Sequence, residues 1–153
     1  MYIKRIIAEK IAERMQPNRA VLIFGARRVG KTMLIKQITD GFAGKTMMLN
    51  GDDMDIQALL GDSSIANYQR LFSDVELLVI DEAQNIPDIG KKLKLIVDEI
   101  PGIKVIASGS SSFDLKNKTG EPLVGRATQF FLFFFSQAEI SQTENVLDTR
   151  RNI

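Results

Sequence analysis

Gly-Ala-Arg-Arg-Val-Gly-Lys-Thr forms residues 25–32 and has the spacing Gly-x-x-x-x-Gly-Lys-Thr. This spacing is typical of a phosphate-binding loop when a strand precedes it and a helix follows it. Both neighbours are expected, because an apolar run fills residues 20–24 and apolar residues recur at helical spacing beyond the motif. The sequence therefore predicts that the chain binds a nucleoside triphosphate through one continuous segment, which consists of Gly25, Ala26, Arg27, Arg28, Val29, Gly30, Lys31, Thr32 and Met33.

The fixed positions of this motif have distinct chemical tasks. Gly25 and Gly30 allow backbone conformations that a side chain would obstruct, so that successive N–H groups point toward phosphate oxygens. Lys31 brings a cation to the β and γ phosphates, where it serves both binding and catalysis, and Thr32 offers its hydroxyl to Mg²⁺. The following helix directs its positive end at the same anion. The structural alternative is a glycine turn that merely enters a helix.

A second motif follows another apolar run. Residues 77–80 are typical of a strand buried on both faces of a parallel sheet, and Asp81 and Glu82 come directly after it. In a doubly wound sheet the ligand lies outside the carboxyl ends of the strands, so we expect Asp81 to hold Mg²⁺ through water. Glu82 would face the γ phosphate and deprotonate water as the catalytic base. An isolated Asp-Glu pair would instead be interpreted as a solvated turn.

Composition limits the classes of protein that remain. The 153 residues, 44% hydrophobic and 25% charged, predict one compact domain. Cysteine and histidine are absent, which excludes disulfides, Cys/His zinc sites and an imidazole base. The net charge of +1, without a dense basic run, does not indicate nucleic acid as a partner. No apolar stretch approaches the roughly 20 residues of a membrane span, and no signal-peptide core is evident, so we expect a cytoplasmic protein without membrane contact.

Hydrophobic periodicity predicts alternating helices and strands along the chain. We expect strands at residues 20–24, 45–50, 77–80, 104–107 and 130–135, and helices at 3–15, after the phosphate loop, within 54–72 and from Pro87 to about residue 100. The first helix has one apolar face, formed by Ile3, Ile6, Ile7, Ile11 and Met15. We interpret this face as packing on the sheet, with a membrane-surface helix as the alternative.

Three polar residues near later strands are further candidates for the site. Ser108 and Ser110 follow the strand at 104–107, where a hydroxyl could contact the γ phosphate or the attacking water. The alternative is that they are helix caps or turn formers. Arg126 ends a polar, glycine-containing segment at 114–126. We include Arg126 as a catalytic candidate that stabilises transition-state charge in its own subunit or in a neighbour, against the alternative of a solvated side chain.

The end of the chain combines an aromatic run with a polar tail. Residues 130–135 hold five of the nine phenylalanines and are interpreted as a doubly buried strand. The alternative is an interface or an aggregation-prone edge, so self-association is a further expectation. Ser136 and Glu139 have capping-box spacing for a short helix. Residues 141–153 are polar and show no core pattern.

Together these residues resemble the AAA-like P-loop ATPases of bacteria and archaea, in which an N-terminal ATPase domain is joined to a C-terminal domain of unknown function. The resemblance covers roughly residues 1–140. It rests on the phosphate loop, Leu-Asn-x-Asp-Asp at 49–53, Ile-Asp-Glu-x-Gln at 80–84, Gly-Ser-Ser-Ser at 109–112, Leu-x-Gly-Arg at 123–126 and Ser-x-x-Glu at 136–139. Phe134 stands where the family usually has proline.

The resemblance implies a three-layer α/β P-loop NTPase fold with a mainly parallel five-stranded sheet of order 5-1-4-3-2, and Mg-ATP as the ligand. It assigns Lys31 and Thr32 to phosphate and metal, Asp81 and Glu82 to the acid pair, and γ-phosphate sensing to the region of Ser108 or Ser110. It also implies a division into an ATPase domain at 1–140 and a tail at 141–153, where a longer protein would continue into a C-terminal domain or contact another protein.

The expected activity is Mg-dependent ATP binding and hydrolysis coupled to a conformational change. The alternative is a nucleotide-gated interaction module with negligible turnover. A phosphotransferase is a weaker hypothesis, because a kinase has no use for Glu82 beside Asp81. Glu82 favours hydrolysis. The family's C-terminal part, which we expect to be missing after about residue 140, would be needed for full turnover, and this favours the interaction module.

Overall fold

The computed structural model describes residues 2–25, 30–109 and 123–132, and helices alternate with strands along them. The elements are α1 (Tyr2–Arg14), β1 (Arg19–Gly25), α2 (Lys31–Asp40), β2 (Thr46–Asn50), α3 (Met54–Leu59), α4 (Ile65–Phe72), β3 (Leu77–Asp81), a 3₁₀ turn (Ala83–Asn85), α5 (Ile89–Glu99), β4 (Lys104–Gly109) and β5 (Ala127–Leu132). The alternation places this part of the chain in the α/β class.

The five strands form one sheet with the order β2-β3-β4-β1-β5. Every neighbouring pair is parallel. This is the predicted order 5-1-4-3-2 in reverse notation, so the predicted fold is confirmed. Because the strands are parallel, all their carboxyl ends meet at one edge, which we call the carboxyl edge; the opposite edge is the amino edge. The segments that follow β1, β2, β3 and β4 therefore begin at the carboxyl edge.

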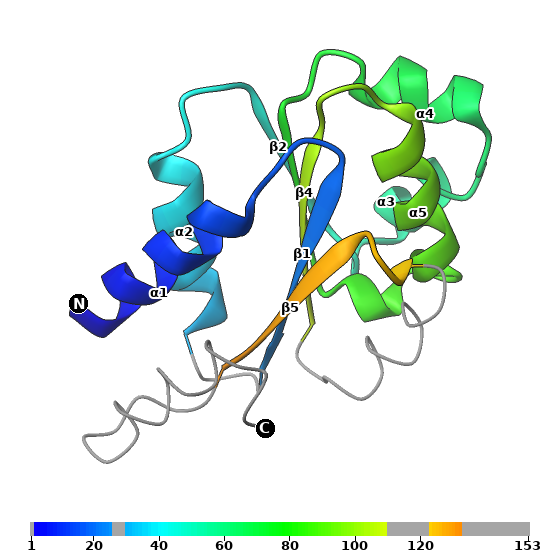
Figure 1. Ribbon diagram of the computed structural model, residues 1–153. Coiled ribbons are helices and arrows are strands. Elements are labelled where there is room, and N and C mark those ends of the chain that lie inside the picture. Colours follow the sequence, from blue (N-terminus) through cyan, green and yellow to red (C-terminus); the bar gives the residue numbers. More distant parts are fainter. Residues whose placement is uncertain (1, 26–29, 110–122, 133–153) are drawn as a thin grey trace.

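Helices cover both faces of the sheet (Figure 1). α1 and α2 lie on one face, and α3, α4 and α5 lie on the other. Strand side chains alternate between the two faces: Val21, Ile23, Val79 and Ile106 pack with α1 and α2, whereas Leu22, Phe24, Ile80 and Val105 pack with α4 and α5. The period of two along each strand thus supplies two separate apolar cores, one for each outer layer.

The first helix packs on the sheet as predicted. Ile7 and Ile11 are fully buried and Met15 is nearly so, in the core that α1 shares with α2 and the strands. The side chain of Ile3 is outside the described part. Among the described residues, no helix has the length and apolar character to cross a bilayer.

The last strand differs from its predicted position. β5 begins at Ala127, three residues earlier than expected, because its backbone pairs with β1 from Ala20 onward and hydrogen bonding decides where the strand begins. Phe130 and Leu132 are buried on the α1–α2 face, while Phe131 on the opposite face lies 5.0 Å from Phe24 between ring centroids. Both faces of the strand therefore pack. Residues 133–135, the expected helix near 136–139 and the tail at 141–153 lie outside the described residues.

Candidate nucleotide site

The phosphate-loop motif joins β1 to α2 at the carboxyl edge. Gly25 is the last residue of β1, and Gly30 precedes α2 with φ 87° and ψ 23°. This left-handed conformation costs a residue with a side chain about 1–2 kcal/mol, so the motif's second glycine has the backbone geometry that the sequence predicts. Ala26, Arg27, Arg28 and Val29 lie outside the described residues. A strand before the loop and a helix after it are the context that the motif requires.

The first turn of α2 presents the three remaining residues of the segment. Lys31 is its first residue and is only 5% exposed, with a buried Nζ atom. Thr32 and Met33 are exposed, and Met33 reaches 59%. The Lys31 side chain is thus buried, while Thr32 is exposed at the same helix terminus. An inward ammonium beside a helix N-terminus favours an anion there.

Asp81 ends β3 at the same edge, and Ser108 of the adjacent β4 binds it. The fully buried Ser108 Oγ donates to Asp81 Oδ1 at 2.5 Å, and the same oxygen accepts from the Glu82 N–H at 2.9 Å. The structure therefore brings two predicted residues together, with Ser108 acting on the carboxylate. A direct contact of Ser108 with phosphate stays a prediction. Ser110, the other predicted serine, lies outside the described residues.

The phosphate loop and the acid pair lie at a separation that suits a ligand. β4 lies between β1 and β3, so the carboxyl ends of β1 and β3 are two strand spacings apart, roughly 10 Å. The helix terminus with Lys31 and Thr32 thus lies on one side, and Asp81 with Glu82 on the other.

Glu82 adopts a left-handed backbone conformation, with φ 51° and ψ 45°. Its half-buried carboxylate accepts a hydrogen bond through Oε1 from Gln84 Nε2 at 2.8 Å, and Gln84 is 7% exposed. A non-glycine residue in this region is uncommon, and such strained residues concentrate at functional sites. The predicted base, the Glu82 carboxylate, therefore lies in a tight turn and is oriented by Gln84 of the same turn.

The loop after β2 closes on this turn. Gly51 N donates to Asp81 O at 2.7 Å, and a Cβ added to Gly51 would lie 2.2 Å from Glu82 O. Real Cβ atoms do not approach backbone atoms this closely, so any side chain at position 51 would displace the Glu82 peptide. Gly51 and Gln84 are site residues that the sequence interpretation missed. The available signal was their place within the Leu-Asn-x-Asp-Asp and Ile-Asp-Glu-x-Gln motifs.

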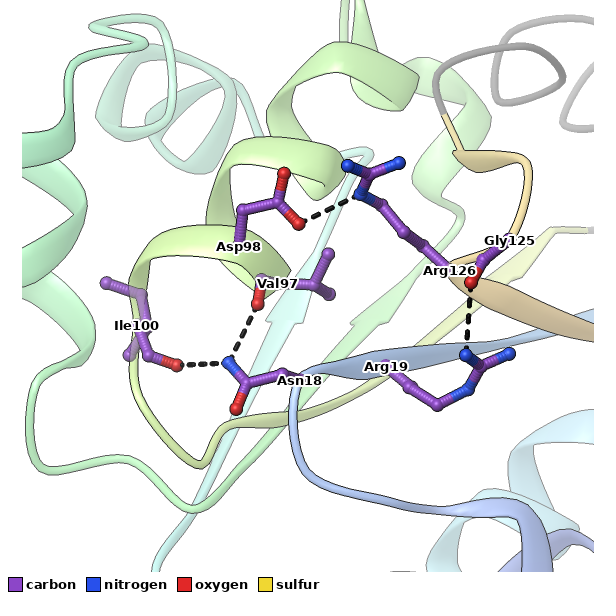
Figure 2. Close-up of polar contacts among 7 residues, drawn as sticks. All are labelled: Asn18, Arg19, Val97, Asp98, Ile100, Gly125 and Arg126. Atoms are coloured by element: carbon purple, nitrogen blue, oxygen red, sulfur yellow. Dashed lines mark hydrogen bonds and ion pairs between the residues drawn. The ribbon is translucent and has the colours of Figure 1, made fainter.

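Arg126 is not brought to the phosphate loop. It immediately precedes β5, and its backbone oxygen accepts from Ala20 N at 2.9 Å, at the amino edge. Figure 2 shows its guanidinium turned toward α5, where Nε contacts Asp98 Oδ1 at 2.8 Å. This hydrogen bond raises the pKa of Arg126. The part of β1 from Ala20 to Gly25, roughly 17 Å long at about 3.3 Å per residue, separates it from Gly25.

This position corrects one expectation about Arg126. β5 runs parallel to β1, so the residue before β5 lies at the edge opposite the nucleotide. A contact with the nucleotide of its own subunit is therefore wrong for the described arrangement, whereas a contact with the nucleotide of a neighbouring subunit stays a prediction.

The residues present fit a magnesium ion by the chemistry of their donors. The Thr32 hydroxyl and the Asp81 carboxylate are oxygen ligands, which Mg²⁺ prefers over nitrogen or sulfur. Within the described ranges no group of three or more acidic, cysteine or histidine residues forms a metal cage. Mg²⁺ at nucleotide sites is usually held by one or two protein ligands together with phosphate oxygens and water, so such a cage is not required.

Residues 17–141 match the sequence model of a family described as "AAA domain", and this match spans the phosphate loop, both acid residues and all five strands. The chain belongs to the AAA domain family. This membership and the parallel sheet indicate nucleotide binding.

Two relatives are similar to this AAA domain over most of its length. They are the uncharacterized proteins Mb2031c of Mycobacterium bovis and Rv2008c of Mycobacterium tuberculosis, each 29% identical over 124 residues. The aligned part covers 80% of this chain but 27% of each relative. The chain thus spans about a quarter of the length of these relatives.

Three solved structures share this fold. The Walker-type ATPase PABY2304 of Pyrococcus abyssi has a TM-score of 0.60 at 18% identity, over 86% of this chain and 53% of that chain. Domain III of the replication initiation protein DnaA of Thermotoga maritima has a TM-score of 0.57 at 17% identity, over 80% and 59%. A structure titled for katanin self-assembly has a TM-score of 0.52 at 14% identity, over 87% and 50%. At these identities the likeness establishes the fold.

Proposed function

We propose that this AAA domain binds Mg-ATP at the carboxyl edge and hydrolyses it, and that hydrolysis drives a conformational change. The observation that carries the proposal is the acid turn after β3, where Ser108 holds Asp81 and Gln84 holds the Glu82 carboxylate. A structural turn would not need two carboxylates oriented by neighbouring side chains. Their place beside the phosphate-loop helix supports hydrolysis in preference to binding alone.

Each residue of the edge has a role in this reaction. Backbone N–H groups of the loop and the Lys31 ammonium bind the phosphates, and Lys31 also offsets the charge that develops on transfer. Thr32 and Asp81 would hold Mg²⁺, which neutralises phosphate oxygens when it is bound. The Glu82 carboxylate takes a proton from the attacking water as that water approaches the γ phosphate. ATP is proposed as the nucleotide because the fold neighbours include a Walker-type ATPase.

A nucleotide-gated switch with negligible turnover remains the second candidate. The position of Arg126 favours it for an isolated subunit, because this arginine pairs with Asp98 at the amino edge. Transition-state charge supplied by an arginine raises turnover by roughly 10³ to 10⁵ in related reactions. Arg126 can therefore take part in the reaction only at the site of a neighbouring subunit. We infer that the chain self-associates, which would provide that neighbour. One fold neighbour carries self-assembly in its title. The greater length of the relatives supports a C-terminal domain as a further partner.

Glu82→Gln separates the two candidate functions. The amide keeps the size and hydrogen-bonding capacity of the side chain but is not a base, so we expect Mg-ATP affinity within about 2-fold of wild type and turnover lower by about 100-fold or more. Calorimetry measures the affinity, and phosphate release under steady-state conditions measures the turnover.

Glu76→Gln is the matched control, since Glu76 is an exposed carboxylate just before β3, at the amino edge. It should leave both quantities unchanged. Unchanged turnover in Glu82→Gln would remove Glu82 as the base, and binding without any hydrolysis by wild-type protein would favour the switch.

A further inference from the structure

The Glu82 turn needs an explanation for its stability as well as for its chemistry. Left-handed backbone costs a residue with a side chain about 1–2 kcal/mol, and it persists only where the surrounding structure enforces it. Glu82 is one of three non-glycine residues with positive φ among the described residues, together with Asn18 and Asp88. Two neighbours that no step of the proposed reaction uses restrict this turn, one at its backbone and one at its side chain.

The backbone contact comes from Gly51 at the end of β2. Its N–H donates to Asp81 O, a bond that completes the pairing of Asn50 with Asp81 at the end of β2 and β3. The Gly51 Cα then lies against the peptide after Glu82, since an added Cβ would meet Glu82 O at 2.2 Å, Glu82 C at 2.9 Å and Asp81 O at 3.2 Å. All three atoms are backbone, so no rotamer change could relieve the overlap. The absent side chain fixes where the Glu82 peptide can lie.

The loop that carries Gly51 is itself anchored on both sides. Asn50 Oδ1 accepts from Asp52 N at 2.9 Å, and Gln57 Nε2 of α3 donates to Gly51 O at 2.8 Å. Asn85 Nδ2 of the acid turn donates to Asp52 Oδ1. These bonds tie the loop at residues 50–53 to α3 and to the 3₁₀ turn after Glu82. The Leu-Asn-x-Asp-Asp motif, which no step of the proposed reaction uses, thereby gains a role.

The side-chain contact comes from Gln84 within the turn. Its Nε2 donates to Glu82 Oε1 at 2.8 Å from a site that is 7% exposed. A buried amide restricts the carboxylate more than a solvated partner would, because water does not compete for the bond. Gln84 thus sets the direction of the carboxylate, while Gly51 sets the position of its backbone.

We propose that Gly51 and Gln84 are positioning residues. Together they place the Glu82 carboxylate where it can take a proton from the water that attacks the γ phosphate. This proposal rests on the proposed function, in which Glu82 is the base. Both residues act through Glu82 and have no required contact with the nucleotide. Misplacing a base by about 1 Å can lower turnover by on the order of 100-fold without weakening substrate binding.

The test compares Gln84→Ala with Asn67→Ala in the full chain. Asn67 is the matched control, because it is also a buried amide at 7% exposure, but it lies on α4 and donates to Leu59 O and Asp62 O. We expect Gln84→Ala to lower kcat about 10-fold with Mg-ATP affinity within about 2-fold of wild type. Asn67→Ala should lower the Tm without changing kcat. Gln84→Ala with the kcat of the control would overturn the role of Gln84.

Gly51→Ala tests the backbone contact, with Gly41→Ala as its control. A Cβ at Gly41 would have only ordinary contacts, the nearest at 3.6 Å, and the backbone there is right-handed. We expect Gly51→Ala to lower kcat about 10- to 100-fold and Gly41→Ala to leave it within about 2-fold. If Gly51→Ala does not fold, Gln57→Ala replaces it, since it removes the bond to Gly51 O; it should lower kcat about 3-fold. Wild-type kcat in the folded variant would overturn the role of Gly51.

Two further readouts separate positioning from general structural damage. In a Glu82→Gln background, Gln84→Ala and Gly51→Ala should cause no additional loss of turnover, because their effect passes through the missing base. Multiplying losses would overturn the proposal. In nucleotide-free protein, where no turnover is needed, the Glu82 amide should exchange its hydrogen about 3-fold faster in Gln84→Ala than in Asn67→Ala. Equal exchange would contradict it. If Glu82→Gln alone leaves turnover intact, the proposed function fails instead.

Discussion

Lys31 is a cation at a buried position, 5% exposed at the first residue of α2. A buried lysine at a helix N-terminus favours a bound anion there. We predict that Lys31→Ala lowers Mg-ATP affinity about 10- to 100-fold, because the β and γ phosphates lose a charged hydrogen-bond donor. The Tm should stay close to that of wild type, so that the lost affinity is not a loss of folding. Calorimetry and thermal unfolding measure the two quantities.

Lys36→Ala on the same helix is the control for this substitution. Its side chain is 68% exposed and pairs with Asp40 at 3.2 Å, so it carries the same charge away from the site. Affinity should stay within about 2-fold of wild type, because an exposed ion pair contributes little. Equal effects of Lys31→Ala and Lys36→Ala would indicate a general charge effect and contradict a specific phosphate contact.

Residue identities at the carboxyl edge could be predicted because short motifs carry them. Lys31, Thr32, Asp81 and Glu82 all follow from spacing and from the strands that precede them. The positive φ of Glu82 could not be predicted, because it depends on the loop after β2 meeting the turn after β3. Gly51 occupies the variable position of a sequence motif. Its role becomes evident only from the structure, in which a Cβ added at Gly51 would overlap with Glu82 O. Contacts between distant segments leave no local pattern.

At the scale of elements, Asn18 joins the amino end of β1 to the carboxyl end of α5 (Figure 2). Its Nδ2 donates to Val97 O at 2.7 Å and to Ile100 O at 2.8 Å, and its Oδ1 accepts from Gly102 N at 3.0 Å. One side chain thus pairs two carbonyls near the end of the helix and the turn that follows. Its own φ of 61° is left-handed, a region that asparagine tolerates better than most residues.

We predict that Asn18→Ala lowers the free energy of unfolding by about 2–3 kcal/mol, from the lost hydrogen bonds and from the strain of alanine at positive φ. Asn18→Gly removes the same bonds without that strain, so it should be more stable than Asn18→Ala by about 1 kcal/mol. Urea unfolding of the three proteins measures both differences. Equal stability of the alanine and glycine variants would rule out the strain, and wild-type stability in both would rule out the bonds.

Periodicity located most elements, and pairing between strands decided the rest. The helix predicted after Pro87 has apolar residues at helical spacing, and all of them are buried: Ile89, Leu93, Ile96, Val97 and Ile100. The helix begins at Ile89, after Pro87, because Asp88 turns the chain with φ 53°. The start of β5 was missed, since Ala-Thr-Gln shows no strand pattern and becomes a strand only by pairing with β1.

At the scale of the whole molecule, topology decides which residues share an edge. Parallel strands connected by helices put every strand terminus that precedes a helix at the carboxyl edge, so the phosphate loop and the acid pair had to meet. The same rule puts Arg126 at the amino edge, because it precedes a strand of the same direction. The sequence left open whether Arg126 acts in its own subunit or in a neighbour, because only the direction of β5 separates the two alternatives.

A catalytic role for Arg126 therefore belongs to an assembly of chains. We predict that the Arg126→Ala and Glu82→Gln variants each turn over slowly when alone. An equal mixture of the two should recover about a quarter of wild-type turnover per chain. The reason is that random mixing pairs an intact Glu82 with a neighbour's intact Arg126 at one site in four. Steady-state phosphate release measures the recovery, which should rise with protein concentration as neighbours assemble. The control is a mixture of Lys31→Ala with Glu82→Gln. The Lys31→Ala chain has lost phosphate binding and the Glu82→Gln chain has lost its base, so neither chain offers a complete site. Turnover of this mixture should stay low. A mixture of Arg126→Ala and Glu82→Gln that stays as slow as this control would mean that Arg126 does not act across subunits, and its pairing with Asp98 would then be its whole role.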